Sequence, residues 1–210
     1  MKIIKILTIL AILFCFGISF YFYPQIPNEM VSHWGVDGQP DDYMSKNIGL
    51  FIAPVISLVL FLLFLFLPKI DPLRKNIEGF RKYYDMFIFL FILFLLYMQV
   101  LVIIWNLGYE FDMGRFLSIA FAVLFFYIGV LLCNSKRNWF LGIRTPWSLS
   151  SDIVWDKTNK MGGRLFKLAG IISLLGFFIP KYAFVLVLAP VILFSILTVV
   201  YSYFTFKKIT

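Results

Sequence analysis

The chain alternates between six long apolar stretches and short polar connectors. The stretches are residues 6–23, 50–67, 86–107, 116–133, 168–180 and 182–206. Most of them approach or exceed the run of about 18 apolar residues that a helix needs to cross a hydrocarbon core of about 30 Å. The pattern predicts an all-α fold, namely a polytopic membrane helix bundle with six transmembrane helices.

The basic residues favour every second connector. The N-terminus, the connectors 68–85 and 134–167, and the C-terminal tail together hold 16 of the 19 lysines and arginines, and the opposite connectors hold 3. Because positive residues are retained on the cytoplasmic side, this split predicts a multi-pass protein of the cell membrane with both termini cytoplasmic. Contact with anionic lipid then explains the net charge of +8, and we expect no direct nucleic-acid partner.

Composition and connector length limit the domain organisation. At 61% hydrophobic and 20% aromatic residues, the chain is too apolar for a soluble domain. The connectors leave no room for a separate soluble domain of about 50 residues. We divide the chain into an N-terminal two-span module (1–67) with an external loop (24–48), a two-span middle module (68–133), and a C-terminal module (134–210) with a cytoplasmic loop (134–164) and two spans.

The first apolar stretch also has features of a secretory signal. Lys2 and Lys5 precede it, and Gly17 and Ser19 form a small-x-small pattern. The apolar run nevertheless continues to Tyr23, which makes it long enough to span a bilayer, and cleavage would leave only five spans. We therefore expect an uncleaved membrane anchor.

The external loop 24–48 contains the chain's single histidine, His33, with three aspartates nearby in the sequence. Asp37 followed by Gly38 is a turn signal, which predicts a short hairpin or a tight loop. A metal site, a pH sensor and a simple packing contact remain open for His33. In the last case His33 and Trp34 pack the loop against the helix ends. The usual ligand spacing of a metal site is missing, so we expect no metal here.

The cytoplasmic loop 134–164 divides at a proline. Pro146 disfavours a helical conformation of the residue before it, so we expect residues 139–149 to be irregular or extended. A serine at 150 or 151 can cap the following helix. That helix is expected to run without interruption over residues 152–178, because the apolar stretch of the fifth span is short on its own.

Polar residues elsewhere give two further expectations. The connector 68–85 holds five basic residues, and we interpret it as a solvated, lipid-facing segment in preference to a partner site. Gln99 and Asn106 are the most polar side chains well inside any span. We expect both to form hydrogen bonds across helices, each contributing about 0.6–2 kcal/mol.

The sequence contains none of the familiar catalytic motifs. With one histidine there is no pair for an HExxH site, and neither a glycine-rich phosphate loop nor a G-x-S-x-G elbow occurs. No acidic residue lies within a span, which disfavours ion-coupled transport. We therefore predict that the protein is not an enzyme and needs no cofactor.

The cytoplasmic loop concentrates arginine and tryptophan. Arginine beside indole can bind an anionic headgroup or a partner surface through charge-assisted hydrogen bonds and cation–π contacts. An interfacial aromatic belt explains the same residues without any ligand. As a hypothesis, the ligand- or partner-binding set is Arg144, Trp147, Trp139, Arg137, Trp155 and Asn159.

Two motif groups resemble known membrane sequences. Residues 24–27 (PQIP), 33–35 (HWG), 38–41 (GQPD) and 45–46 (SK) are similar to a short N-terminal membrane domain of unknown function. Residues 138–151 (NWFLGIRTPWSLSS), Trp155 and residues 158–160 (TNK) are similar to the C-terminal signature of the SdpI-like family. From the first group we take His33, Trp34, Gly38 and Asp41 as a candidate external motif.

The resemblance implies a role in immunity. The SdpI-like family takes its name from a multi-span protein that protects its own cell from a secreted, membrane-acting peptide toxin and holds a transcriptional repressor at the membrane. It implies an immunity or signalling protein, with the lipid bilayer, a secreted peptide toxin outside and a regulatory protein inside as partners. The alternatives are a membrane enzyme acting on lipid or prenyl substrates and a carrier for an uncharged amphipathic molecule.

Overall fold

The structure, a computed structural model, describes residues 2–209, and these are almost entirely helical. The elements in chain order are α1 (Lys2–Phe22), β1 (Glu29–Trp34), β2 (Pro40–Ser45), α2 (Lys46–Gly49), α3 (Ile52–Ile70), α4 (Arg74–Gly79), α5 (Arg81–Asn106), α6 (Met113–Asn134), α7 (Pro146–Ser150), α8 (Asp152–Phe178), η1 (Pro180–Tyr182) and α9 (Ala183–Lys207). Six helical segments are long and apolar enough to cross a membrane. The prediction of a helical bundle with six helices of membrane-spanning length is therefore confirmed within residues 2–209, and the β1–β2 hairpin is the departure from an all-α fold.

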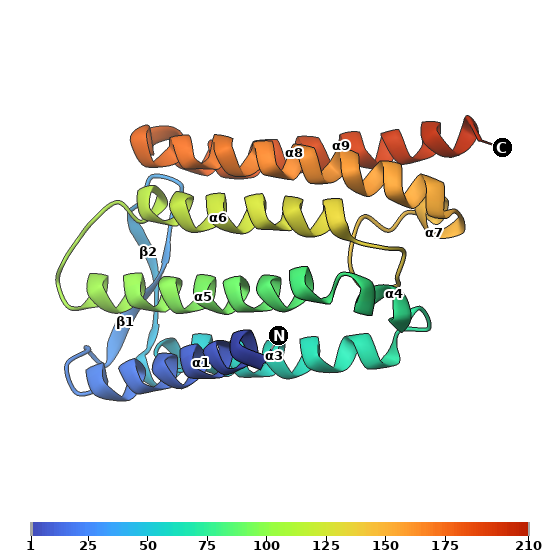
Figure 1. Ribbon diagram of the computed structural model, residues 1–210. Helices are drawn as coiled ribbons and strands as arrows, with labels where there is room; N and C mark the ends of the chain where they lie inside the picture. Colours follow the sequence, from blue (N-terminus) through green and yellow to red (C-terminus); the bar gives the residue numbers. More distant parts are fainter. Residues whose placement is uncertain (1, 210) are drawn as a thin grey trace.

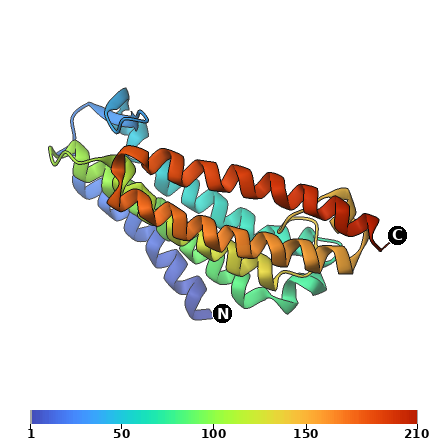
Figure 2. The same cartoon turned by 90° about the horizontal axis from the view of Figure 1, so that it is seen from above.

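The long helices form two groups of three that lie side by side (Figures 1 and 2). Helices α1, α3 and α5 contact one another, α6, α8 and α9 contact one another, and α5 packs on α6 to join the groups. The hairpin lies at one end of the bundle, called the hairpin end, and α4 and α7 lie at the other, called the α7 end. The two spans of the middle module thus pack in different groups.

Small residues allow α6 and α8 to approach at backbone distance. A Cβ atom added to Gly170 of α8 would lie 2.6 Å from the carbonyl oxygen of Ala122 in α6, and one added to Gly163 would lie 2.6 Å from that of Gly129. Side chains larger than hydrogen would therefore force the two helices apart. Close packing of this kind is the main source of helix association in a membrane, where lipid removes the hydrophobic driving force.

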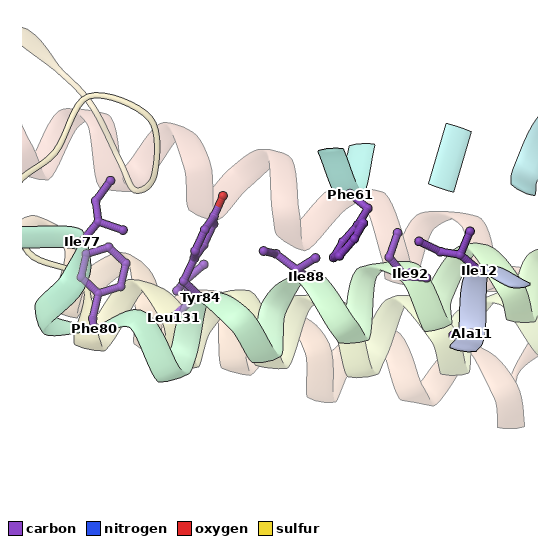
Figure 3. Packing of buried hydrophobic residues seen from close by; sticks show 9 residues of the cluster. All are labelled: Ala11, Ile12, Phe61, Ile77, Phe80, Tyr84, Ile88, Ile92 and Leu131. Carbon is purple, nitrogen blue, oxygen red and sulfur yellow. The ribbon is translucent and has the colours of Figure 1, made fainter. Parts of the chain in front are cut away.

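The first group is held together by a column of buried side chains along α5. Figure 3 shows the column with Phe61 of α3 and with Ala11 and Ile12 of α1 lying against it. Tyr84 is fully buried in this cluster, and its hydroxyl donates a 2.7 Å hydrogen bond to the carbonyl of Phe64. The polar end of the ring is therefore satisfied within an apolar environment.

The polar residues within the third span hold different elements. Gln99 donates to the carbonyl of Leu50 at 2.9 Å and to the hydroxyl of Ser19 at 3.2 Å, which confirms the expected bond across helices. Asn106 instead accepts from the backbone N–H of Val31 at 2.7 Å and donates to the Val31 carbonyl at 3.0 Å. The prediction for Asn106 was wrong in its partner, because β1 lies against α5 and presents an unpaired backbone edge to it.

The connector 68–85 is packed, not solvated, which corrects the expectation from its charge. Asp71 is 3% exposed, and the side chains of Ile77 and Phe80 are buried. Asp71 accepts the backbone N–H of Trp139 at 2.9 Å, and Asn76 donates to the carbonyl of Arg137 at 2.7 Å. The connector therefore forms one layer with the loop after α6, and its basic side chains obscured its apolar contacts in the sequence.

The segment around Pro146 also differs from its prediction. Residues 146–150 form the short helix α7, in which Pro146 occupies the first turn and Thr145 caps the helix with a capping box to Ser148. Proline is well suited to that position, because its missing N–H would have no partner there. The prediction of an irregular segment holds only up to Thr145. Helix α8, by contrast, covers residues 152–178 as expected, with Ser151 as its cap.

Candidate functional site

A large cavity opens at the hairpin end of the bundle. Its volume is about 830 Å³. The walls are mostly apolar side chains of α5, α6 and α9, including Met98, Leu117, Phe121, Phe184 and Leu188. The hairpin turn covers one side of the cavity, where the hairpin extends from the first helix group to the beginning of α6 (Figure 1). The cavity therefore lies between the two groups of helices.

The hairpin is fixed over this cavity by α5. In addition to the bonds between Asn106 and Val31, the ring of Trp34 lies edge-on against Trp105 with centroids 5.7 Å apart. The turn itself depends on Gly38, whose φ of 77° is strained for a residue with a side chain. A Cβ atom on Gly38 would lie 3.4 Å from Asp112. The turn therefore lies against Asp112, the N-cap residue of α6.

The four residues of the candidate external motif all lie on the hairpin, but they do not form one cluster. His33 and Asp41 pair at 2.6 Å between Nδ1 and Oδ1, and both side chains are at least half exposed. Trp34 packs against α5, and Gly38 shapes the turn. Of the contacts expected with the helix ends, Trp34 makes one and His33 faces solvent with Asp41. Within residues 2–209, no group of three or more His, Cys, Asp or Glu side chains is placed to hold a metal ion.

Two carboxylates lie at the cavity; the sequence drew attention to Asp37 only as a turn residue near His33, and it did not single out Asp112. Asp37 and Asp112 both line it, and Asp112 also caps α6 by accepting the N–H of Arg115 at 2.8 Å. Among residues 2–209, neither carboxylate forms an ion pair. Lys181 is the basic residue of the lining, and its ammonium lies 5.7 Å from the centre of the Tyr182 ring.

At the α7 end, the loop after α6 is organised by Asn138. Its side chain is fully buried and donates to the carbonyls of Lys136 and Leu141, both at 2.8 Å. Its side-chain oxygen accepts the N–H groups of Phe140 and Leu141 at 3.0 and 2.7 Å. One side chain therefore supplies the hydrogen bonds that a regular helix or strand would provide, and the loop has a single defined shape.

Trp155 and Asn159 support this loop from α8. Both are nearly inaccessible, at 2% and 1% exposure. The indole N–H of Trp155 donates to the carbonyl of Ser135 at 3.2 Å, and the side-chain oxygen of Asn159 accepts the N–H of Ile143 at 2.8 Å. Gly142, with φ 118°, lies directly over both side chains. In the binding hypothesis these two residues act by positioning the loop, since their side chains do not reach its surface.

The arginines and the remaining tryptophans lie at the surface of the same loop. Arg137 pairs with Asp152 at 2.8 Å and donates to the carbonyl of Leu149 at 2.9 Å. Arg144 is exposed and donates to the carbonyl of Trp139, whose ring is half exposed. The structure therefore brings Arg144 and Trp139 together in an accessible position, while Arg137 ties α7 to the beginning of α8.

Helix α9 contacts the same loop. The Thr145 hydroxyl lies 2.5 Å from that of Ser202, and the Trp147 ring lies edge-on to Tyr203 with centroids 5.1 Å apart. Sequence reasoning did not identify Thr145, Ser202 or Asn138. For Asn138 and Thr145, the available signal was a polar residue beside a glycine- or proline-containing turn. Ser202 had no such signal, because it is one of several hydroxyl residues in an apolar helix.

Comparison with known sequences bears on both ends. Residues 134–202 match the SdpI/YfhL protein family, and residues 10–58 match a domain of unknown function, DUF1648. The C-terminal third of the chain is therefore similar to the SdpI/YfhL family. It is 26% identical over 206 residues to the Immunity protein SdpI of Bacillus subtilis (strain 168), which covers 98% of this chain and 97% of that protein. No solved structure gives a significant match.

These matches confirm the resemblance drawn from the two motif groups. The DUF1648 match includes the second part of α1, the hairpin and the beginning of α3, and the SdpI/YfhL match includes the loop after α6, α7, α8 and most of α9. Together with six membrane-spanning helices, they identify the chain as a multi-pass membrane protein similar to an immunity protein. Both matched regions contribute to the cavity lining, together with residues of α5 and α6 that lie between them in the chain.

Proposed function

We propose that this protein is an integral membrane protein of the immunity and signalling type, which protects its cell against a membrane-acting peptide or senses it. The observation that carries the proposal is the similarity to an immunity protein over 98% of the chain. Because the similarity extends through both helix groups, it concerns the whole architecture. The function requires recognition of a peptide and no catalytic step.

The proposal includes an orientation. Six spans place both termini on one side, and the 16 to 3 split of basic residues favours the cytoplasm for that side. The hairpin end then faces outward, where a secreted peptide arrives. The α7 end faces inward, where a regulatory protein is available as a partner.

Helix α9 supports a signalling role in this arrangement. Its first turns line the cavity through Phe184 and Leu188, and its last turns contact the inner loop through Ser202 and Tyr203. A displacement of α9 by a ligand at the outer end would therefore alter the support of Thr145 and Trp147 at the inner end. Such a path is a mechanical connection between the two candidate surfaces.

The function is tested by survival. The gene is expressed in a bacterium that is sensitive to a secreted membrane-acting peptide, and we expect growth at peptide concentrations that kill the same strain carrying an empty vector. A chain with Gly170→Leu, which disrupts the α6–α8 contact, serves as the inactive control. Equal killing with and without the wild-type protein, at normal membrane abundance, across a panel of such peptides would contradict the proposal.

The orientation has its own test. A cysteine introduced at Asp37 should react with a membrane-impermeant maleimide in intact cells, and one introduced at Lys157 should react only after permeabilisation. Both positions are exposed, so accessibility within the fold does not limit labelling. A reporter fused after Thr210 should be active only in the cytoplasm. Labelling of Lys157→Cys in intact cells would reverse the assignment.

A further inference from the structure

The cavity at the hairpin end has the size and lining of a ligand site. Its volume of about 830 Å³ falls within the range of about 300–1,000 Å³ that is usual for such sites. Leu117 and Phe121 of α6 and Phe184 and Leu188 of α9 provide apolar walls from two helices. A space of this size accepts several apolar side chains of a peptide, and it is too small for a folded protein domain.

The charge at the cavity selects among apolar ligands. Asp37 comes from the hairpin turn and Asp112 from the α6 cap, and the turn brings the two segments into contact at Gly38. Neither carboxylate has an ion-pair partner among residues 2–209, whereas His33 is already paired with Asp41. The lining thus offers two unpaired negative charges against the single positive charge of Lys181. This balance favours a cation and disfavours an anionic lipid headgroup.

We propose that this cavity binds a cationic amphipathic peptide, with apolar side chains inserted between α6 and α9 and a basic side chain held by Asp37 and Asp112. The inference rests on the proposed function for the class of ligand, and it adds the site and the charge of that ligand. The hairpin acts as the outer wall, so it determines access from the water side.

The test measures binding directly. The full-length protein is reconstituted in nanodiscs of phosphatidylcholine, and the probe is a short fluorescent helical peptide composed of leucine and lysine. Empty nanodiscs give the background from partitioning into lipid. A matched peptide with glutamate in place of lysine tests the sign of the charge. We expect saturable binding of the lysine peptide and binding of the glutamate peptide that is weaker by about tenfold or more.

Two kinds of variant locate the site. Leu117→Trp and Leu188→Trp fill the cavity from opposite walls, and each should weaken binding by about tenfold. Asp37→Asn and Asp112→Asn should each weaken it by about threefold, with the loss diminishing at high salt. Asparagine also caps a helix well, so Asp112→Asn preserves α6. Asp42→Asn is the matched control, because Asp42 lies on the same hairpin outside the cavity and should bind as the wild type does.

Three outcomes overturn the inference. Unchanged binding in both tryptophan variants would place the peptide elsewhere, and equal binding of the two peptides would remove the role of the carboxylates. Phospholipid retained by the wild type in native mass spectrometry, absent from Leu117→Trp and not displaced by the peptide, would make lipid the occupant. Thermal unfolding of each variant in detergent confirms that it is folded before binding is measured.

The survival assay separates this inference from the proposed function. A Leu117→Trp variant that loses peptide binding and protection together supports both. A variant that binds and protects as well as the wild type overturns the cavity while the immunity function stands. A wild-type protein that binds the peptide in the cavity but protects no cell supports the site and overturns the immunity function.

Discussion

The two ends of this bundle are built on opposite principles. At the α7 end, polar groups meet other polar groups of the protein: Asn138 satisfies four backbone groups, and Asp71 and Asn159 each fix one N–H of the loop. At the hairpin end, a space of about 830 Å³ remains, with two carboxylates that form no ion pair within residues 2–209. The difference agrees with the proposed ligand site at the hairpin end and with a single fixed shape at the α7 end.

The contrast also assigns different work to the motif residues. On the hairpin, Trp34 and Gly38 position a wall of the cavity, whereas in the loop after α6 Trp155 and Asn159 position a surface that carries Arg144. In both regions a buried residue or a glycine with positive φ shapes the segment, and the accessible charges lie beside it. Variants can separate these two roles.

The largest effect is expected at the contact shared by both ends, the α6–α8 seam. The Cβ atom of Gly170→Leu would lie 2.6 Å from the Ala122 carbonyl oxygen and 2.7 Å from the Phe126 backbone nitrogen, and the rest of the side chain would add to this clash. We expect destabilisation of about 3 kcal/mol or more and a several-fold fall in membrane abundance. Gly17→Leu is the control, since no atom of another helix lies within 4 Å of its added Cβ. Immunoblots of the membrane fraction compare the two variants, and equal abundance would contradict the importance of close α6–α8 packing.

A smaller but clear loss of stability is expected for Asn138→Ala. The substitution removes four hydrogen bonds and leaves partly buried backbone groups without these partners, which we expect to cost about 2–4 kcal/mol. Asn134→Ala removes one bond to the carbonyl of Val130 within its own helix, and it should cost less than about 1 kcal/mol. Thermal unfolding in detergent compares the two. A similar loss of stability in both variants would show that the loop after α6 is not organised by Asn138.

At the hairpin end, Asn106→Leu should release the hairpin and leave the bundle intact. It removes both bonds to the Val31 backbone, at 2.7 and 3.0 Å. We expect local opening to become easier by about 1–3 kcal/mol, so that hydrogen exchange in residues 29–45 accelerates by about fivefold or more. Gln99→Leu acts within the bundle and should leave exchange in the hairpin unchanged. If hydrogen exchange in residues 29–45 stayed slow in Asn106→Leu, the contacts of Trp34 and of the helices would be sufficient to hold the hairpin.

The smallest structural effect is expected for Arg144→Lys. Arg144 is exposed, so the change should alter stability by less than about 1 kcal/mol. Function should nevertheless decline. The planar guanidinium of arginine can donate to the Trp139 carbonyl and present further N–H groups outward at the same time, and lysine lacks this geometry. Protection or partner retention is measured beside an immunoblot, with Lys136→Arg as control. Arg137→Lys is not neutral, since Arg137 bonds both Asp152 and Leu149. Full activity of Arg144→Lys would reduce the loop's role to bulk positive charge.

Some features followed from short-range chemistry and were legible in the sequence. The six spans could be predicted because a bilayer requires continuous apolar runs of a set length. The uninterrupted helix 152–178 could be predicted because a serine cap and an apolar run determine it locally. The cross-helix role of Gln99 followed from the absence of water in the membrane interior. The hairpin turn at Gly38 was expected for the same kind of reason, since glycine tolerates positive φ.

Other features depended on which segments meet, and no local pattern records that. The connector 68–85 looked solvated because its lysines and arginines are conspicuous, yet Asp71 and Asn76 are bound by a loop more than 60 residues away. Pro146 has the same restriction on its neighbour in an extended segment and in the first turn of a helix, so only the contacts of Thr145 with Ser148 and Ser202 decided for α7. The cavity likewise exists only because α5 and α9 belong to different helix groups with the hairpin placed across them. The sequence by itself determined the spans, the serine cap before α8 and the family resemblance, since these depend on neighbouring residues. The tertiary structure alone decided the site, because a site depends on distances between residues far apart in the chain.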